Sequence, residues 1–398
     1  MRAWIAAVGL TMLLGCGRVG FGARADGGAG TDGATSMPDA GGTEADSGAV
    51  DRDGGAPPDG GLTPLTIDKL TADEPLLRTF APGSGNCGEY LITLGDGWSP
   101  TTFMRGAEIW FAIPCKYSDA SSGGWHTAFA HWNGSDPTAT WVDGDPATPG
   151  IQETLSKFAL GSDGMPLNSQ ETQYYVEDAA GRLLGLGRRY QSAVSDYQTY
   201  PIVAPSFEAY DETHWRLDLV DTHELSAADG TWRGQTEIPR DILRVGDAFW
   251  IFGQSTNAPI SDTSYVIAWT TTDMLSATHR SAPLAVGYHH PFVVAVPDGT
   301  LRMVAFDEGV RQWVIVRGTA PDAWNFDAAV ALDLSPFQGA RGAWDFALYP
   351  SYGAQPRIVG AETLGSDLFL FYMAGVFDYP TTPPYDQPRG IGVLRVAL

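Results

Sequence analysis

Glu237 is the residue of this chain whose setting is most typical of acid–base chemistry. It stands two positions before Pro239, at the start of a segment rich in aromatic and branched residues. A second carboxylate must face it, because general acid–base hydrolysis needs one group to protonate the leaving oxygen and another to activate water or attack. Asp96 and Glu171 are the alternatives for that second group. Glu237, Asp96 and Glu171 are therefore the predicted catalytic residues.

Four further side chains could contact a ligand. His290 precedes a proline, and Trp98, Trp344 and Asp345 could supply stacking rings and a hydrogen-bond acceptor. Each also has a structural reading, since tryptophans mostly pack between elements and a buried histidine is commonly satisfied by its neighbours. We predict all four as substrate-binding residues. No zinc motif, phosphate loop or nucleophile elbow is present in the sequence, so no metal site is predicted.

The elements that would position Glu237 are two short strands, 240–245 and 248–253, joined by a turn at Gly246. Pro239 is expected to open the first strand rather than lie within it, because proline has no donor for the ladder. The same pattern of proline, strand, glycine turn and aromatic strand recurs in three other segments, at 100–112, 291–306 and 356–372. One structural unit is therefore used several times.

The composition favours an all-β protein. The chain has 398 residues, with 48 glycines, 27 prolines and 11% aromatic residues, and few stretches have a long helical period. No second linker follows residue 63, so residues 63–398 are predicted to form one domain. That length exceeds a usual single core and favours repetition around an axis. We predict a five-bladed β-propeller, with a large sandwich or jelly roll as the alternative.

The first residues predict export. A short apolar run at 3–14 is too short to span a bilayer but fits a signal peptide. Its ending, Leu13-Leu14-Gly15-Cys16, resembles the bacterial lipobox, which implies a lipoprotein signal peptide at 1–16 and lipidation of Cys16. The alternative is an ordinary signal peptide that contains a cysteine. Residues 17–62 have almost no large apolar side chains and are predicted to be a disordered Gly/Ala/Asp-rich linker.

Two cysteines remain for the exported domain, Cys87 and Cys115. In an oxidising compartment they are predicted to form a disulfide, with two unpaired thiols as the alternative. The net charge of −23 argues against nucleic acid as a partner, because phosphate backbones are bound by lysine and arginine. The expected location is the bacterial cell envelope, at the outer membrane.

The repeated unit resembles a blade of the five-bladed furanosidase-type glycoside hydrolases of families 43 and 32. The resemblance rests on Thr236-Glu237-Ile238-Pro239, on Ala-Pro-Asp-Ala-Trp at 320–324, and on Phe-Tyr-Met-Ala at 371–374 followed by Ile-Gly-Val at 391–393. In those families a catalytic Glu stands just before the third-blade proline, the place of Glu237. The resemblance implies a monomeric, lipid-anchored protein that hydrolyses or recognises arabinose-, xylose- or fructose-type glycans.

The chain departs from the family pattern in two places. Where the family has an Asp directly before the first-blade proline, this chain has Ser99, with Asp96 three residues earlier. Where an Asp is expected in the second blade, Glu171 is an approximate match. A non-catalytic carbohydrate- or protein-binding propeller is therefore the alternative function. The resemblance implies no cofactor, with an axial calcium ion near the histidine as an open alternative.

Overall fold

The computed structural model describes residues 65–71, 73–78, 100–116, 125–141, 170–191, 196–204, 237–255, 264–274, 279–337, 339, 345, 355–374 and 390–398. At some strand ends, including Glu171, Glu237 and Cys115, it describes the backbone alone. The described part is almost entirely β-structure, with one short 3-10 helix, η2 (Ser335–Phe337). It contains no helix of the length and apolarity that crossing a membrane requires.

The described strands form five antiparallel sheets. Named from the innermost strand outward, sheet 1 contains β3 (Thr101–Arg105), β4 (Glu108–Lys116), β5 (Trp125–Trp132) and β6 (Thr140–Trp141), and sheet 2 contains β7 (Gln170–Glu177), β8 (Leu183–Gln191) and β9 (Asp196–Ala204). Sheet 3 contains β10 (Glu237–Val245), β11 (Ala248–Ser255) and β12 (Tyr265–Thr271), and both β13 (His279–Arg280) and β14 (Ala285–Val286) pair with β12. Sheet 4 contains β15 (Tyr288–Ala295), β16 (Leu301–Asp307), β17 (Gln312–Ala320) and β18 (Ala323–Leu332), and sheet 5 contains β19 (Arg357–Leu364), β20 (Asp367–Ala374) and β21 (Gly390–Ala397), with both β1 (Ile67–Lys69) and β2 (Leu77–Arg78) paired with β21.

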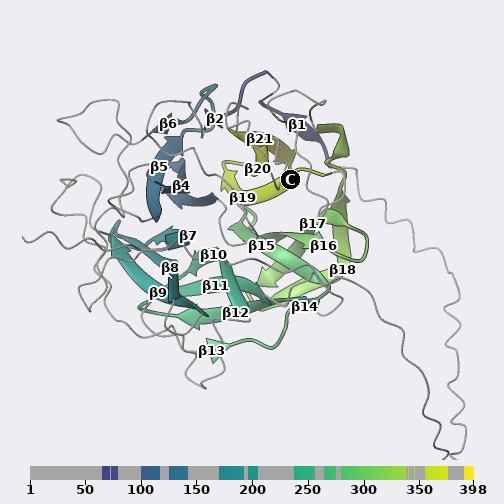
Figure 1. Ribbon diagram of the computed structural model, residues 1–398. Helices are drawn as coiled ribbons and strands as arrows, with labels where there is room; N and C mark the ends of the chain where they lie inside the picture. Colours follow the sequence, from purple (N-terminus) through teal and green to yellow (C-terminus); the bar gives the residue numbers. More distant parts are fainter. Residues whose placement is uncertain are drawn as a thin grey trace, which may run out of the picture. The chain divides into compact units, whose positions relative to one another are not determined.

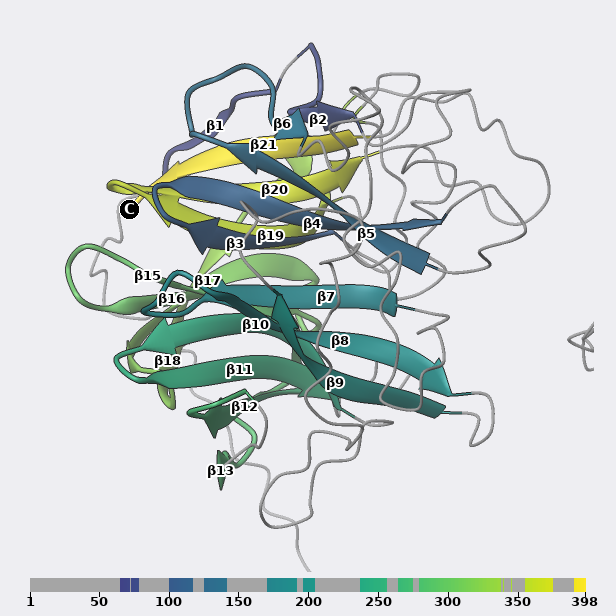
Figure 2. The same cartoon turned by 90° about the vertical axis from the view of Figure 1, so that its left-hand side faces the viewer.

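The innermost strands form a ring. Strand β3 contacts β7, β7 contacts β10, β10 contacts β15, β15 contacts β19, and β19 contacts β3 (Figures 1 and 2). This is the arrangement of a β-propeller, so the predicted all-β propeller is confirmed. Of the predicted five blades, four are sheets of at least four strands, while the sheet β7–β9 has three strands in the described part.

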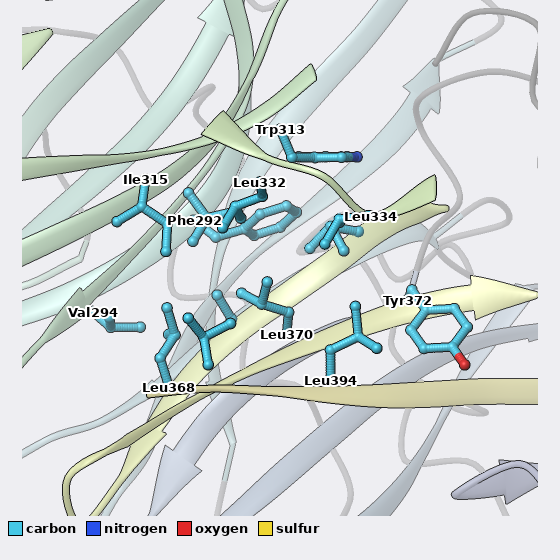
Figure 3. Close-up of a cluster of buried hydrophobic side chains, with 14 of the residues drawn as sticks. Phe292, Val294, Trp313, Ile315, Leu332, Leu334, Leu368, Leu370, Tyr372 and Leu394 are labelled. Atoms are coloured by element: carbon cyan, nitrogen blue, oxygen red, sulfur yellow. The ribbon is translucent and has the colours of Figure 1, made fainter. Parts of the chain in front are cut away.

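Apolar side chains fill the space between neighbouring sheets. The cluster drawn in Figure 3 joins sheets 4 and 5, and includes Phe292, Trp313, Leu370 and Leu394. Sheets 5 and 1, 2 and 3, and 3 and 4 are joined by three similar clusters. Sheets 3, 4 and 5 are therefore apolar on both faces, which explains why their strand sequences read as nearly continuous apolar runs.

The strands follow the predicted repeat in most respects. The predicted turn glycines Gly106, Gly246, Gly299 and Gly365 all have φ between 60° and 79°, which is a conformation that glycine adopts without strain. These turns connect β3 to β4, β10 to β11, β15 to β16 and β19 to β20. The turn prediction is confirmed because a left-handed glycine is a local requirement, visible in the sequence.

The expectation for Pro239 is wrong. Strand β10 begins at Glu237, so Pro239 lies within it, beside a bulge between Pro239 and Asp241. The strand tolerates the proline because it is innermost and pairs on one side only, so that no ladder bond is lost on the other side. Bulges also interrupt β7, β15 and β19 near their first residues. Each of these strands is thus bent where it enters the axis.

The ring is closed by a strand from each end of the described chain, β1 and β21. Strand β1 pairs with β21 as the outer strand of sheet 5. Lys69 at the end of β1 donates to the Phe337 carbonyl oxygen at 3.0 Å and forms an ion pair with Asp345, which is 3% exposed. The sheet at the closing point is therefore held by backbone pairing and by a buried charge pair.

Candidate functional site

The innermost strands run in the same direction along the axis. The amide of Val293 on β15 donates to Oδ2 of Asp241 on β10 at 2.5 Å, and three residues earlier the amide of His290 donates to Oε1 of Gln254 at 2.6 Å. Gln254 is paired with Ile238, three residues before Asp241. Both strands therefore advance by the same three residues between these contacts, which is the behaviour of strands with a common direction.

A common direction gives the axis two distinct ends. We call the end where β3, β7, β10, β15 and β19 begin the strand-start end, and the end where their glycine turns lie the turn end. At the turn end the amide of Gly106, after β3, donates to Oε2 of Glu177, the last residue of β7, at 2.8 Å. The ends of these two strands are therefore level.

The predicted catalytic residues with a described backbone lie at the strand-start end. Glu237 is the first residue of β10 and Glu171 is the second of β7, and these two strands are in contact. Their side chains are outside the described part, as are Asp96, Trp98, Trp344, Cys16 and Cys87 in full. The structure thus places the two backbones at one end, while the carboxyl separation remains a prediction.

His290 is buried at the same end. Its side chain is 2% exposed, and its backbone has φ of 54°, a conformation that non-glycine residues seldom adopt. The bulge between His289 and Phe292 produces this conformation. Beside it, Nδ1 of His289 lies 2.9 Å from Oε1 of Glu308, and the two histidine ring centroids are 4.6 Å apart. Strained, buried polar residues of this kind cluster at functional sites.

Asp345 has a different setting. It is buried and bonded to Lys69 of β1, the contact that closes sheet 5. The described contacts of Asp345 are thus structural, and its predicted contact with substrate remains a prediction.

Two arginines at the strand-start end were not anticipated. Arg240 on β10 and Arg357 on β19 are each 3% exposed, and each directly follows a proline at the bulged start of its strand. A buried guanidinium offers five donors in a fixed fork and is well suited to hold carboxylates or the hydroxyl oxygens of a ligand. The repeated Pro-Arg pair was the available signal in the sequence.

Two acidic residues near the middle of the ring were also missed. Asp241 accepts the Val293 amide and, at 2.8 Å, its neighbour's amide at Ile242. Burial raises the pKa of Asp241 to about 7, against the lowering effect of these two donors. Burial, followed by the charge of Asp241, raises the pKa of Glu362 well above its ordinary value, while a hydrogen bond with Thr102 opposes the shift. Two carboxyl groups thus titrate together inside the ring.

A cavity of about 460 Å³ lies at the turn end. It is lined by residues from the innermost strands of all five sheets, including Phe103, Tyr175, Asp241, Val293 and Glu362. It is therefore an axial cavity, and it lies at the opposite end of the strands from Glu237 and Glu171.

The axial calcium alternative finds no cluster of acidic or histidine side chains among the described residues. These residues contain no group of three or more His, Cys, Asp or Glu side chains that could hold a metal ion. Calcium takes about six to eight oxygen ligands. The axial calcium alternative therefore lacks a ligand set in this part of the chain, and we derive no chemistry from it.

Comparison with known proteins gives a likeness of fold. No protein-family model and no curated protein sequence matches the chain. Among solved structures, an alpha-L-arabinofuranosidase from Podospora anserina is 10% identical, with a TM-score of 0.50, over 82% of this chain and 96% of that one. A glycosyl hydrolase from Bacteroides ovatus is 11% identical, with a TM-score of 0.45, over 83% and 93%. The Podospora enzyme and this protein share the propeller fold.

Proposed function

We propose that this protein is a glycoside hydrolase-like propeller that acts on arabinose-, xylose- or fructose-type glycans at its strand-start end. One observation carries the proposal: Glu237 is the first residue and Glu171 the second residue of neighbouring innermost strands that run in the same direction. Two carboxyl groups from adjacent blades can then flank one glycosidic bond, which is the minimum requirement for its hydrolysis.

In this proposal Glu237 is the general acid that protonates the leaving oxygen. Asp96 or Glu171 is the second carboxylate, and it activates water or attacks the sugar. A separation of roughly 6.5–9.5 Å between the two carboxyl groups gives inversion, because a water molecule must fit between carboxylate and sugar, whereas about 5–5.5 Å gives retention. The nearby buried His290, Arg240 and Arg357 supply donors for the hydroxyl groups of the sugar.

The test is turnover of aryl arabinofuranosides, xylosides and fructan oligosaccharides by the exported protein. Glu237→Gln should lower turnover by about three orders of magnitude or more while glycan binding changes little, because the amide keeps the shape and loses the proton. Glu108→Gln is the matched control, since Glu108 is a part-exposed residue of strand β4, the second strand of sheet 1, and it pairs with His131 at 3.1 Å. Unchanged turnover in Glu237→Gln would contradict the role of Glu237.

A second candidate function is a non-catalytic propeller that binds carbohydrate or protein. Ser99 favours it, because the related families have an acid at that position and serine cannot replace a general base. If the protein binds glycans from a broad panel but hydrolyses none of them, the non-catalytic binding function is supported. Failure of both turnover and glycan binding would leave a protein partner as the ligand.

We also propose that the domain is held at the bacterial outer membrane by a lipid on Cys16, as a monomer. The support is the Leu-Leu-Gly-Cys ending of the apolar run and the linker composition of residues 17–62. Acyl chains contribute about 0.8 kcal/mol per buried CH₂, so several chains make a permanent anchor. Cys16→Ser should move the protein from the membrane fraction to the soluble fraction, and an unchanged distribution would contradict lipidation.

A further inference from the structure

The axial cavity at the turn end is lined by both aromatic and acidic side chains. Phe103 and Tyr175 form part of its wall, with Val293 and Val294 from β15. The first two are nearly buried, with rings 5.5 Å apart between centroids, so the wall is apolar and aromatic. Asp241 and Glu362 are the two carboxyl groups within this apolar setting. The cavity thus combines an aromatic wall with an acidic centre made of the part-buried Asp241 and the buried Glu362.

The acidic centre has hydrogen bonds but no ion pair in the described part of the chain. Asp241 accepts two backbone amides, from Val293 and Ile242. Glu362 is 8% exposed and is bonded to Thr102. Buried carboxylates are normally paired with cations or bind them, because an uncompensated charge is costly to remove from water. Near neutral pH a bound proton neutralises a carboxyl group of this pair, and a bound cation can take the place of that proton.

The other charged groups that face the cavity are engaged at its rim. Glu177 accepts the Gly106 amide, and Nε of Arg244 donates to the Gly246 carbonyl oxygen at 3.1 Å. Both interactions fix the glycine turns rather than the acidic centre. Tyr175 is the remaining titratable group of the lining, and burial raises its pKa, so it stays neutral. Glu177 and Arg244 are therefore engaged at the rim, and Asp241 and Glu362 are the carboxyl groups inside the cavity.

We propose that this cavity binds a small primary alkylammonium ion, with the nitrogen at Asp241 and Glu362 and the alkyl body against Phe103 and Tyr175. An ammonium group has three donors for the remaining lone pairs of the two carboxyl groups. An aromatic wall adds cation–π attraction. The binding site is separate from the strand-start end, so it stands whether or not the protein hydrolyses glycans.

An alkylammonium ion fits better than a metal ion. The described lining has Asp241 and Glu362 inside the cavity and Glu177 at its rim, and these residues do not form a group of three acidic or histidine ligands that could hold a metal ion. A calcium ion needs about six to eight oxygens. The volume of about 460 Å³ and the apolar wall instead accommodate a chain of several carbon atoms.

The proton and the ligand compete for the same oxygens. Burial raises the pKa of Asp241 to about 7, and burial, followed by the charge of Asp241, raises the pKa of Glu362 well above its ordinary value. Below neutral pH the acidic centre must lose a proton to hold a cation, so affinity increases as the pH rises through 7. At pH 6 binding should release about one proton, and at pH 8 clearly less than one.

The experiment is isothermal titration calorimetry of the exported protein with n-butylammonium chloride, in buffers of different ionisation enthalpy. We expect binding with the pH dependence given above, and no binding of n-butanol, the uncharged analogue. The double variant Asp241→Asn/Glu362→Gln should lose roughly 30-fold or more of the affinity, because neither position can then carry a carboxylate charge. Asp68→Asn, which removes an exposed carboxylate paired with Arg395, should bind like the wild type.

Several results would overturn the proposal. These are the absence of a binding heat for butylammonium, equal binding of butanol, or an affinity that does not change between pH 6 and pH 8. Calcium binding that displaces butylammonium and is lost in the double variant would identify a metal site instead. The measurements on the wild type decide the question even if the double variant fails to fold.

Discussion

Oδ2 of Asp241 accepts the backbone amide of Val293 at 2.5 Å, so a side chain of β10 occupies the edge that β15 presents to the axis. The innermost strands β10 and β15 do not pair by a backbone ladder, since each pairs only with the next strand of its own sheet. The carboxyl group takes the place of that ladder. Neighbouring sheets are thereby held in register at the axis, at the cost of burying an acid in the ring.

Glu362→Gln should make the protein more stable at alkaline pH. The ordinary pKa of this carboxyl group is 4.5, and it is raised well above that in the folded chain. Between these two values the folded state holds a proton that the unfolded state has lost, so the free energy of unfolding falls as the pH rises. Glutamine does not ionise, so the variant does not lose stability in this way. The difference in free energy of unfolding between the variant and the wild type should grow by up to about 1.4 kcal/mol for each pH unit above 4.5.

The measurement is urea unfolding of both proteins at pH 4, 6 and 8. Glu108→Gln, which removes a part-exposed carboxylate, should instead follow the wild-type curve closely. Parallel pH profiles for Glu362→Gln and the wild type would show that Glu362 is ionised normally in the folded protein.

Lys69→Met should destabilise the domain by about 3–5 kcal/mol, because it leaves the carboxylate of Asp345 buried without a cation. Arg395→Met is the matched control on the same strand pair. Arg395 and Asp68 form an exposed pair with a distance of 2.6 Å, and exposed pairs contribute less than about 1 kcal/mol. Adding Asp345→Asn to Lys69→Met should restore part of the loss. Equal effects of the two single variants in denaturant unfolding would contradict a special role for Lys69.

Trp313→Phe should weaken the junction of sheets 4 and 5. The indole Nε1 donates to the Pro356 carbonyl oxygen at 2.9 Å, and the side chain is 0% exposed. Phenylalanine leaves that oxygen without its donor, which costs about 1–3 kcal/mol before any loss of packing. Trp324→Phe should cost less, since its bond to Pro321 is local and water can replace it. Thermal unfolding of both variants checks the order, which the reverse ranking would refute.

Cys87 and Cys115 are expected to form a disulfide when the protein folds in an oxidising compartment. Peptide mass spectrometry without a reductant should detect a linked pair, and reduction should lower the stability by about 2–4 kcal/mol. Alkylation of both thiols before reduction would show that the bond is absent.

The sequence by itself determined the repeating strand pattern and the turns. Gly106, Gly246, Gly299 and Gly365 are recognisable because a positive φ is a property of one residue and its immediate neighbours. The aromatic and branched strands are recognisable for a similar reason, since side chains that pack between sheets must be apolar wherever they occur. The sequence predicted Glu237 to lie just ahead of a strand that Pro239 opens, whereas in the structure Glu237 is the first residue of β10.

The tertiary structure alone decided which residues meet at the axis. Lys69 and Asp345 are 276 positions apart, and their pair exists because β1 completes sheet 5. Asp241 and Glu362 look like ordinary strand residues in the sequence, yet the closed ring partly buries Asp241, buries Glu362 and couples their titration. The position of Pro239 within β10 was not predicted for a similar reason. The sequence does not show that β10 pairs with β11 alone and so has one unpaired edge that tolerates a proline. Burial and charge coupling depend on distances between sheets, and no local pattern in the sequence encodes those distances.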